Sequence, residues 1–516
     1  MFATPKSEFT HKATPNLTVG PVIGRTTTHS VRILLETLEA TVYTLVLIDT
    51  SDGGNGTQIE REISLPRRVP VVTYIDGLEP STPYTLEIEG EEVGRFRTLG
   101  VRARGLRAGI VSCNKPSDGV LDGSEASLWE TLGDKAPELD VVFHVGDQVY
   151  ADPAYQAVLD LVESGQLAPE DERWVDVVSE LYRNFYRRNW SAPATRRALA
   201  SVSNVFIWDD HEIRDDFGSI EGDADPESLA YKIGLVARMV YREYQAALTR
   251  EESEIYTSDL EHLMYRMGNV GIVILDQRGG RSFYKAVNGD DESADEGYLG
   301  RAQWDDLERE IVHQDGMFAS DDVQHLVVAT SVPLVYLNSV LTDVGAQVDS
   351  INDLKDHWAY GEHEAEQSRM IDMLLNWKYG DAHATTPYND RTVTIVAGDV
   401  HVGLHSLIRR PNAVKGSSEQ VLMQFTASAI TNTPPAPPLL AILTKALQRP
   451  IPIPKDKFGV FFSHAHVMKE SNIGLLSISE DGDVHTTLIG LSGAIVHSSD
   501  VLDQAFDSGA CCCSLM

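Results

Sequence analysis

The residues of this sequence best suited to chemistry follow short apolar segments. Asp147 and Tyr150, two oxygen donors three residues apart, come directly after the apolar segment 141–145 and the turn residue Gly146. An apolar run of this length predicts a buried strand, and glycine permits the sharp turn after it. Polar residues beyond the carboxyl end of a buried strand stand where α/β sheets bind ligands. A polar loop that caps a core strand has the same local pattern, so this segment alone leaves both interpretations open.

The pattern recurs after three further apolar segments, in residues 112–114, 208–218 and 398–405. They carry a thiol, carboxylates and imidazoles: Cys113, Asp209, Asp210, His211, Asp215, Asp399 and His401. Since four strands end in such residues, we expect the four ends to converge at one edge of a sheet. Oxygen and imidazole ligands suit hard or borderline cations, and an added tyrosinate or thiolate favours a ferric ion.

The composition is that of an ordinary folded chain. Its 516 residues predict two or more domains, or one large α/β domain with an accessory. The formal net charge of −34 opposes contact with polyphosphate backbones, so we expect no nucleic-acid partner. No apolar run is long enough for a transmembrane helix, and the first residues lack the pattern of a secretory signal. A single internal cysteine, Cys113, fits a reducing compartment.

Residues 17–99 are predicted to form an N-terminal immunoglobulin/fibronectin-like β-sandwich domain. Short strands separated by turn residues are expected at 31–35, 41–48, 59–63, 71–75 and 84–88. Residues 77–86 resemble the corner of fibronectin type III domains, where a tyrosine braces the turn before a late strand. We expect a packing and positioning module here.

Residues 104–492 are predicted to form a second, α/β domain, because apolar strands now alternate with helical periodicity. Strands are expected at 106–111, 141–145, 204–207, 270–275, 325–330, 392–397, 421–425, 473–478 and 485–489. Helices are expected at 124–133, 153–164, 171–197, 226–248, 301–314 and 364–377.

Taken together, these motifs resemble the PhoD-like alkaline phosphatases and phosphodiesterases of the calcineurin-like metallophosphoesterase superfamily. The matching segments are 112–113, 146–152, 208–212, 275–278 and 398–401, and the resemblance extends over roughly residues 18 to 490. It implies a four-layer αββα metallophosphoesterase sandwich with a multinuclear metal site. It also implies metal-dependent hydrolysis of phosphoric mono- or diesters, with a phosphate ester as the substrate.

The resemblance implies ferric iron with a second divalent metal, calcium or another cation. Cys113, Asp147 and Tyr150 would hold the iron, and Asp147 would bridge the two metals. The second metal would use Asp210, and the site would be completed by Asp399 and His401. Asp209 and Asp215 are further oxygen donors close in sequence, and Asp215 is included among the predicted ligands. For Cys113 the alternative is a small buried hydrophobic residue.

The expected chemistry follows from these ligands. Two neighbouring cations lower the pKa of a bridging water, which makes hydroxide available at neutral pH, and they neutralise charge on the phosphate. His211 is the predicted catalytic proton donor or hydrogen-bond stabiliser of the leaving alkoxide. Arg278 is predicted to grip a phosphate oxygen, with a surface salt bridge as the alternative. His405 is either a partner behind the ligands or an exposed strand residue.

Two weaker signals have ordinary explanations as well. His464 and His466 lie two residues apart on one predicted strand face, which is more often a structural arrangement. The segment 356–358 is expected in a loop that lines the cleft, although Trp358 equally suits the core.

Residues 493–516 are predicted to be a flexible tail that ends in a prenylation box, Cys513-Ser-Leu-Met. The final methionine favours farnesylation of Cys513 by a prenyltransferase. One prenyl chain binds membranes weakly, so we expect palmitoylation of Cys511 or Cys512 as a second anchor. This places the protein on the cytosolic face of a membrane in a eukaryotic cell. A reactive or metal-binding cysteine cluster is the alternative.

Two other function classes remain open from the sequence. One is a catalytically degenerate, lipid-anchored interaction protein that uses its β-domain. The other is a metallohydrolase that acts on a carboxylic or sulfate ester. The sequence leaves the physiological substrate open.

Overall fold

The computed structural model describes residues 16–501, apart from 52–55, 102, 220, 224, 251–259, 282–296, 340–341, 343–354, 381–383, 385, 412–418, 436, 438–439, 441–443 and 445–448. The tail cysteines Cys511, Cys512 and Cys513 lie outside the described residues. Within these limits, no helix combines the length and the apolar character needed to cross a membrane.

The first part of the chain forms a three-stranded and a four-stranded antiparallel sheet. The first sheet has the order β1 (Leu17–Thr26), β2 (Ser30–Thr37) and β5 (Val71–Asp76). The second has the order β4 (Gln58–Leu65), β3 (Thr41–Asp49), β6 (Pro83–Ile88) and β7 (Glu91–Arg97). One hydrophobic core joins both sheets. Tyr84 accepts a hydrogen bond from the backbone N–H of Glu79 at 2.9 Å, as expected of a tyrosine that braces a corner.

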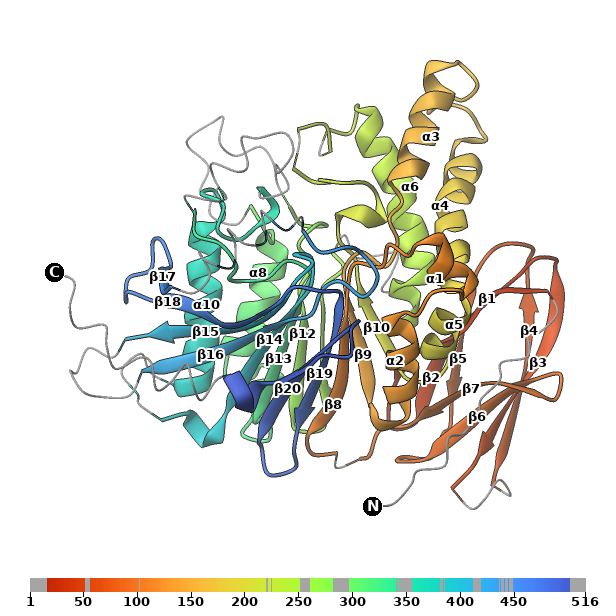
Figure 1. The fold of residues 1–516 in the computed structure, drawn as a ribbon. Coiled ribbons are helices and arrows are strands. Elements are labelled where there is room, and N and C mark those ends of the chain that lie inside the picture. Colours follow the sequence, from red (N-terminus) through yellow and green to blue (C-terminus); the bar gives the residue numbers. More distant parts are fainter. Residues whose placement is uncertain are drawn as a thin grey trace.

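The rest of the chain contains two larger sheets with helices packed around them (Figure 1). The six-stranded sheet has the order β10 (Asn204–Ile207), β9 (Val141–Val145), β8 (Leu106–Val111), β19 (Asn472–Ile478), β20 (Val484–Gly490) and β21 (Ile495–His497). The eight-stranded sheet has the order β11 (Leu263–Met267), β12 (Val270–Ile274), β13 (His325–Thr330), β14 (Thr392–Ala397), β16 (Gln420–Thr426), β15 (Gly403–Arg410), β18 (Phe461–Met468) and β17 (Ile451–Pro452). The predicted strands are confirmed, with ends that differ from the expected ones by at most two residues.

The helices of this part differ from the expected ones mainly at their ends. They include α1 (Asp118–Asp122), α2 (Leu128–Lys135), α3 (Asp152–Glu163), α4 (Trp174–Trp190), α5 (Pro193–Leu199), α6 (Leu229–Tyr244), α8 (Arg301–Leu307) and α10 (Glu364–Tyr379). The single helix expected at 171–197 was wrong, because Pro193 begins a new helix after α4. Helix α2 begins later than expected, where the Ser127 hydroxyl caps it by accepting from the N–H of Trp129 at 3.2 Å.

Neighbouring residues of β13 face two different cores. Val327 belongs to a core that also contains Ile110 of β8, so this core lies between the two large sheets. Val328 belongs to a second core with Trp304 of α8 and Leu374 of α10. Figure 1 shows these two helices on the outer face of the eight-stranded sheet. The mixed α/β class is therefore confirmed.

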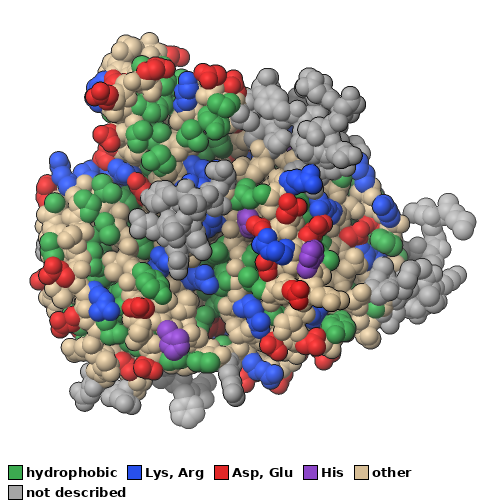
Figure 2. Space-filling view, turned by 180° about the vertical axis from the view of Figure 1, so that it is seen from behind, with side chains coloured by type: hydrophobic (Ala, Val, Ile, Leu, Met, Phe, Trp, Pro, Cys, Tyr) green, Lys and Arg blue, Asp and Glu red, His purple; other side chains and the backbone are tan. Residues whose placement is uncertain are grey.

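The acidic balance of the chain does not form one uniform surface. Figure 2 shows acidic and basic side chains interspersed over the face seen from behind.

Large apolar side chains are exposed on α4 and α6, namely Val175, Leu235 and Met239.

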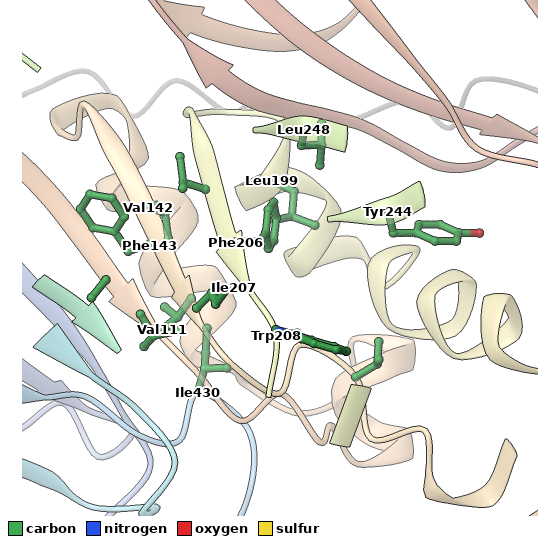
Figure 3. Close-up of a cluster of buried hydrophobic side chains, with 14 of the residues drawn as sticks. Val111, Val142, Phe143, Leu199, Phe206, Ile207, Trp208, Tyr244, Leu248 and Ile430 are labelled. Atoms are coloured by element: carbon green, nitrogen blue, oxygen red, sulfur yellow. The ribbon is translucent and has the colours of Figure 1, made fainter. Parts of the chain in front are cut away.

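A packed core fixes the strands β8, β9 and β10 beneath their carboxyl ends. Figure 3 shows its side chains, which come from these strands, from helices beside them and from loops: Val111, Val142, Phe143, Leu199, Phe206, Ile207, Trp208, Tyr244, Leu248 and Ile430. Each of these residues is at most 3% exposed. Strands fixed in this way present the residues that follow them on a rigid base.

Hydrogen bonds join the N-terminal sheets to this base. The side-chain amide of Asn204, at the start of β10, donates to the carbonyl of Ile23 in β1 at 2.9 Å. Glu36 of β2 is fully buried and accepts hydrogen bonds from Arg187 of α4 and Tyr244 of α6, each at 2.5 Å. A buried carboxylate is tolerated where such donors satisfy it, so β1 and β2 are part of the support for the six-stranded sheet.

Candidate metal centre

The loops after β8, β9 and β10 are joined by their backbones at one edge of the six-stranded sheet. The three strands are parallel, so their carboxyl ends meet at this edge. The N–H of Cys113 donates to the carbonyl of Gly146 at 3.3 Å, and the N–H of Asn114 donates to that of Asp147 at 2.7 Å. On the other side, the N–H of Gly146 donates to the carbonyl of Ile207 at 3.0 Å. The expected convergence at one sheet edge is confirmed for these three strand ends, whereas the fourth strand, β14, belongs to the eight-stranded sheet.

Glu212 ties the β9 and β10 loops together. Its carboxylate is fully buried and accepts from the backbone N–H groups of Asp147 at 3.1 Å, Gln148 at 2.6 Å and Asp209 at 2.7 Å. A fourth bond, at 3.0 Å, comes from the side chain of Gln245. Glu212 and Asp209 also form a capping box around the short 3-10 helix Asp210–Glu212. Glu212 therefore positions ligand candidates, because its own oxygens are already satisfied.

Several of the predicted ligands have strained backbones. A positive φ occurs at Cys113 (56°), Asp147 (56°), Asp399 (65°) and His401 (53°). Such conformations cost free energy in residues other than glycine and cluster at functional sites. The loops also approach closely: a Cβ on Gly398 would lie 2.5 Å from the carbonyl oxygen of Val145. Glycine is required there for β14 to bring Asp399 to the edge formed by β9.

Asp147 lies at the centre of two groups of possible metal ligands. One ligand atom each from Asp147, Asp210 and His211 lie within 4.8 Å of one another. The same limit holds for Asp147 with Asp209 and Asp399. Since Asp147 belongs to both groups, its carboxylate has the position that a bridging ligand requires.

The Cys113 thiol and the Tyr150 phenol contact Asp147, and one imidazole contacts that phenol. The Sγ of Cys113 lies 3.5 Å from Oδ2 of Asp147, and the Tyr150 hydroxyl lies 3.2 Å from the same oxygen. The Tyr150 hydroxyl also lies 3.2 Å from Nε2 of His401 and accepts from the amide of Asn432 at 2.8 Å. Residues from four separate loops thus meet at one carboxylate.

The electrostatics of this group favour bound cations. Burial raises the pKa of the Cys113 thiol, the Tyr150 phenol and the Asp147 and Asp399 carboxyls well above their ordinary values, and neighbouring carboxylates add to this effect. Burial also raises the pKa of Asp209 to about 6. Oδ1 of Asp147 and Oδ2 of Asp209 are buried and have no hydrogen-bond partner in the part of the chain that the structure describes. Buried carboxylate oxygens without partners are costly unless they bind a cation, so these residues fit a metal centre.

His211 lies beside Tyr150, with ring centroids 4.0 Å apart, and its Nδ1 lies 3.0 Å from Oδ2 of Asp152. Burial alone would lower the pKa of His211, but the carboxylates of Asp210, Asp147 and Asp152 outweigh it and raise the pKa well above its ordinary value. Asp215 belongs to neither ligand group found among the described residues. Its side chain is 68% exposed and lies 3.6 Å from Nε2 of His211, so the structure places it at the rim.

Arg278 is buried under the carboxylates. Its guanidinium contacts Asp209 through Nε, Asp356 at 2.5 Å and Asp210 at 3.4 Å, and it also donates to the carbonyl of Phe217 at 3.0 Å. A surface salt bridge is therefore excluded. Every guanidinium nitrogen already faces protein oxygen, so Arg278 positions carboxylates, and its contact with phosphate stays a prediction.

Several functional residues were missed by sequence reasoning or left undecided. Asp152 and Glu212 lie inside the quoted motifs, which is the signal that could have found them, whereas Asn432 had no such signal. The segment 356–358 does reach the site, through Asp356, while Trp358 is core.

His405 and His464 form hydrogen bonds within the core of the protein. His405 is buried in β15, with Nε2 3.1 Å from the hydroxyl of Thr486. His464 bonds to the Ser406 hydroxyl at 2.7 Å and to the carbonyl of Tyr336 at 3.0 Å. Neither belongs to the ligand groups found among the described residues.

Comparison with known proteins gives a family match. A family model described as PhoD-like phosphatase matches residues 109–467. An uncharacterized protein of Saccharomyces cerevisiae, YGR266W, is 22% identical over 400 residues, which include 58% of this chain and 52% of that protein. The chain thus spans about half the length of this curated relative.

Two solved structures are similar to this chain, and the first of them shares its fold. The structure of PhoD has a TM-score of 0.60 at 15% sequence identity, and the match covers 95% of this chain and 93% of the PhoD chain. At this identity the likeness concerns the fold. A purple acid phosphatase from yellow lupin (Lupinus luteus) has a TM-score of 0.47 at 10% sequence identity, and the match covers 93% of this chain and 75% of the phosphatase chain.

Proposed function

Because the chain belongs to the PhoD-like phosphatase family, we propose that it hydrolyses phosphoric mono- or diesters at the metal centre around Asp147. The observation that carries the proposal is the membership of Asp147 in two ligand groups, one with Asp210 and His211 and one with Asp209 and Asp399, together with buried carboxylate oxygens that lack hydrogen-bond partners among the described residues. Intact ligands favour this function over a degenerate interaction protein.

The donor types support ferric iron on one side of Asp147 and a divalent metal on the other. Cys113, Tyr150 and His401 are the candidates for the iron position, since thiolate and phenolate favour a ferric ion. Asp210 and Asp399 are the candidates for the second position, and Asp209 is an additional oxygen donor. When bound, such cations supply hydroxide at neutral pH and neutralise charge that develops on the phosphate.

His211 and Asp152 have the arrangement of a proton-donating pair. Asp152 faces Nδ1 of His211 at 3.0 Å, which fixes the ring and stabilises its protonated form. Nε2 then carries the proton that the leaving alkoxide needs. Arg278 holds Asp209 and Asp210 in place through ion pairs.

We retain the finer fold assignments as part of the proposal. They are a four-layer αββα sandwich over residues 104–492 and an immunoglobulin/fibronectin-like β-sandwich over 17–99. The two cores that β13 separates support the first, and the shared core of the two small sheets supports the second.

Membrane attachment is a separate proposal, for a chain that ends at Met516. It rests on the sequence of Cys511, Cys512 and Cys513 alone. Farnesylation of Cys513 by a prenyltransferase, with palmitoylation of a neighbouring cysteine, would place the enzyme on the cytosolic face of a membrane.

Purified protein tests the catalytic proposal by elemental analysis combined with hydrolysis of p-nitrophenyl phosphate and bis-p-nitrophenyl phosphate. We expect bound metal and turnover of at least one ester, both lost in Asp147→Asn. Asp140→Asn is the matched control, because Asp140 lies at the opposite end of β9, where it pairs with Arg107. Turnover that survives Asp147→Asn together with Asp399→Asn overturns the proposal.

A further inference from the structure

His357 is a buried histidine whose ring nitrogens lack hydrogen bonds to the described residues. It is 4% exposed, and its ring stacks on Tyr336 with centroids 5.4 Å apart. Its Nδ1 is buried without a partner. Its Nε2 faces Oδ2 of Asp399 at 3.7 Å. A buried polar ring of this kind points to a ligand, because buried polar groups are normally satisfied.

The distance between His357 and Asp399 distinguishes a direct contact from a shared ligand. A hydrogen bond from nitrogen to oxygen spans about 2.7–3.2 Å, so 3.7 Å is too long. Two donor atoms that each lie about 2.1 Å from one cation are about 3.0–3.7 Å apart for angles between roughly 90° and 125°. The observed separation falls at the upper end of this range.

His357 belongs to neither ligand group found among the described residues, but its contact with Asp399 places it next to one of them. Asp399 belongs to the ligand group with Asp147 and Asp209, and Oδ2 of Asp209 is a second buried atom without a partner. The neighbour of His357, Asp356, is fixed by ion pairs with Arg278 and Arg281. The loop that carries His357 is therefore anchored to the arginine that also contacts Asp209.

We propose that His357 is a ligand of the second cation, together with Asp399, and that this position selects zinc or ferrous iron over calcium. The inference rests on the metal centre of the proposed function. Calcium takes oxygen ligands, whereas neutral imidazole suits zinc and iron. Tyr336 and Asp356 would hold the ring in the orientation that binding requires.

Metal binding, measured apart from turnover, tests this assignment. The variants are His357→Ala and His357→Gln, and the matched control is His405→Gln. His405 is also fully buried with an unpartnered Nδ1, but its Nε2 bonds to Thr486. Metal-depleted protein is titrated with zinc and with calcium by calorimetry, and the purified variants are analysed for iron and zinc.

We expect wild type and His405→Gln to bind zinc more tightly than calcium. Both His357 variants should retain iron and lose at least tenfold in zinc affinity. Wild-type zinc affinity in a folded His357→Gln protein, or tighter binding of calcium than of zinc by wild type, overturns the inference. If metal binding behaves as expected and no ester is hydrolysed, the proposed function fails while the ligand assignment stands.

Discussion

Replacing Glu212 by glutamine separates positioning from ligation at the metal centre. The carboxylate accepts four hydrogen bonds, three of them from the backbone N–H groups of Asp147, Gln148 and Asp209. A glutamine would present an NH2 group to two donors, so two bonds are lost and two N–H groups are left buried. At about 1.5–3 kcal/mol for each bond to a charged group, the loss is about 3–6 kcal/mol.

The expected consequence is a displaced Asp147 and weaker metal binding. For a chain of this length, the loss lowers the melting temperature by roughly 3–6 °C. Glu261→Gln is the control, since Glu261 is equally buried and pairs with Arg238 and Arg242 away from the site. Differential scanning fluorimetry and elemental analysis should find both variants destabilised, but only Glu212→Gln depleted of metal. Full metal content and wild-type turnover in Glu212→Gln would refute the positioning role.

Three further outcomes are expected. His211→Asn and Asp152→Asn should lower kcat by about 10²–10⁴ for alkyl esters and much less for p-nitrophenyl esters, whose leaving group needs no proton; equal losses on both would contradict proton donation. In metal-depleted protein, burial raises the pKa of Asp209 to about 6, above its unfolded value of about 3.9. The folded form then binds more protons than the unfolded form, so the free energy of unfolding should fall as the pH rises from about 4 to 6, by about 1.4 kcal/mol per pH unit for each such group. Added metal should restore the lost stability, and a free energy of unfolding that does not change over this pH range would contradict the prediction. Cys513→Ser should release the full-length protein from membranes in cell fractionation, and unchanged membrane binding would reject the anchoring proposal.

The strand ends of the site could be predicted because their signals are local. Apolar runs before Gly146 and Gly398 indicate buried strands and tight turns, and parallel strands bring the loops at their carboxyl ends to one edge. The approach of Asp147, Asp210 and Cys113 is therefore expected from short patterns in the sequence, whereas Asp399 follows β14 of the other large sheet and reaches Asp147 only because the two sheets pack together.

Residues that depend on contacts between distant segments could not be predicted in the same way. Arg278 suggested a phosphate contact or a surface pair, but the packing of the two large sheets encloses it between Asp209 and Asp356. His357 gave no signal as a ligand candidate, since its approach to Asp399 depends on how the loop at 355–361 crosses the site.

Two features near the site depend on tertiary context. Asp215 lies close in sequence to Asp210, but its side chain is mostly exposed, and its role as a ligand stays a prediction. Strand β15 was not predicted, because it contains Arg409 and Arg410 although all its residues are buried. The partners of Arg410, which include Asp372 and Gln420, come from other elements.

The most direct test of the metal centre is anomalous diffraction at the iron absorption edge, on crystals of the purified, active protein. We predict an iron peak within bonding distance of Cys113, Asp147 and Tyr150. An iron peak elsewhere in the molecule, or none in crystals of protein that hydrolyses phosphate esters, would contradict the proposed centre.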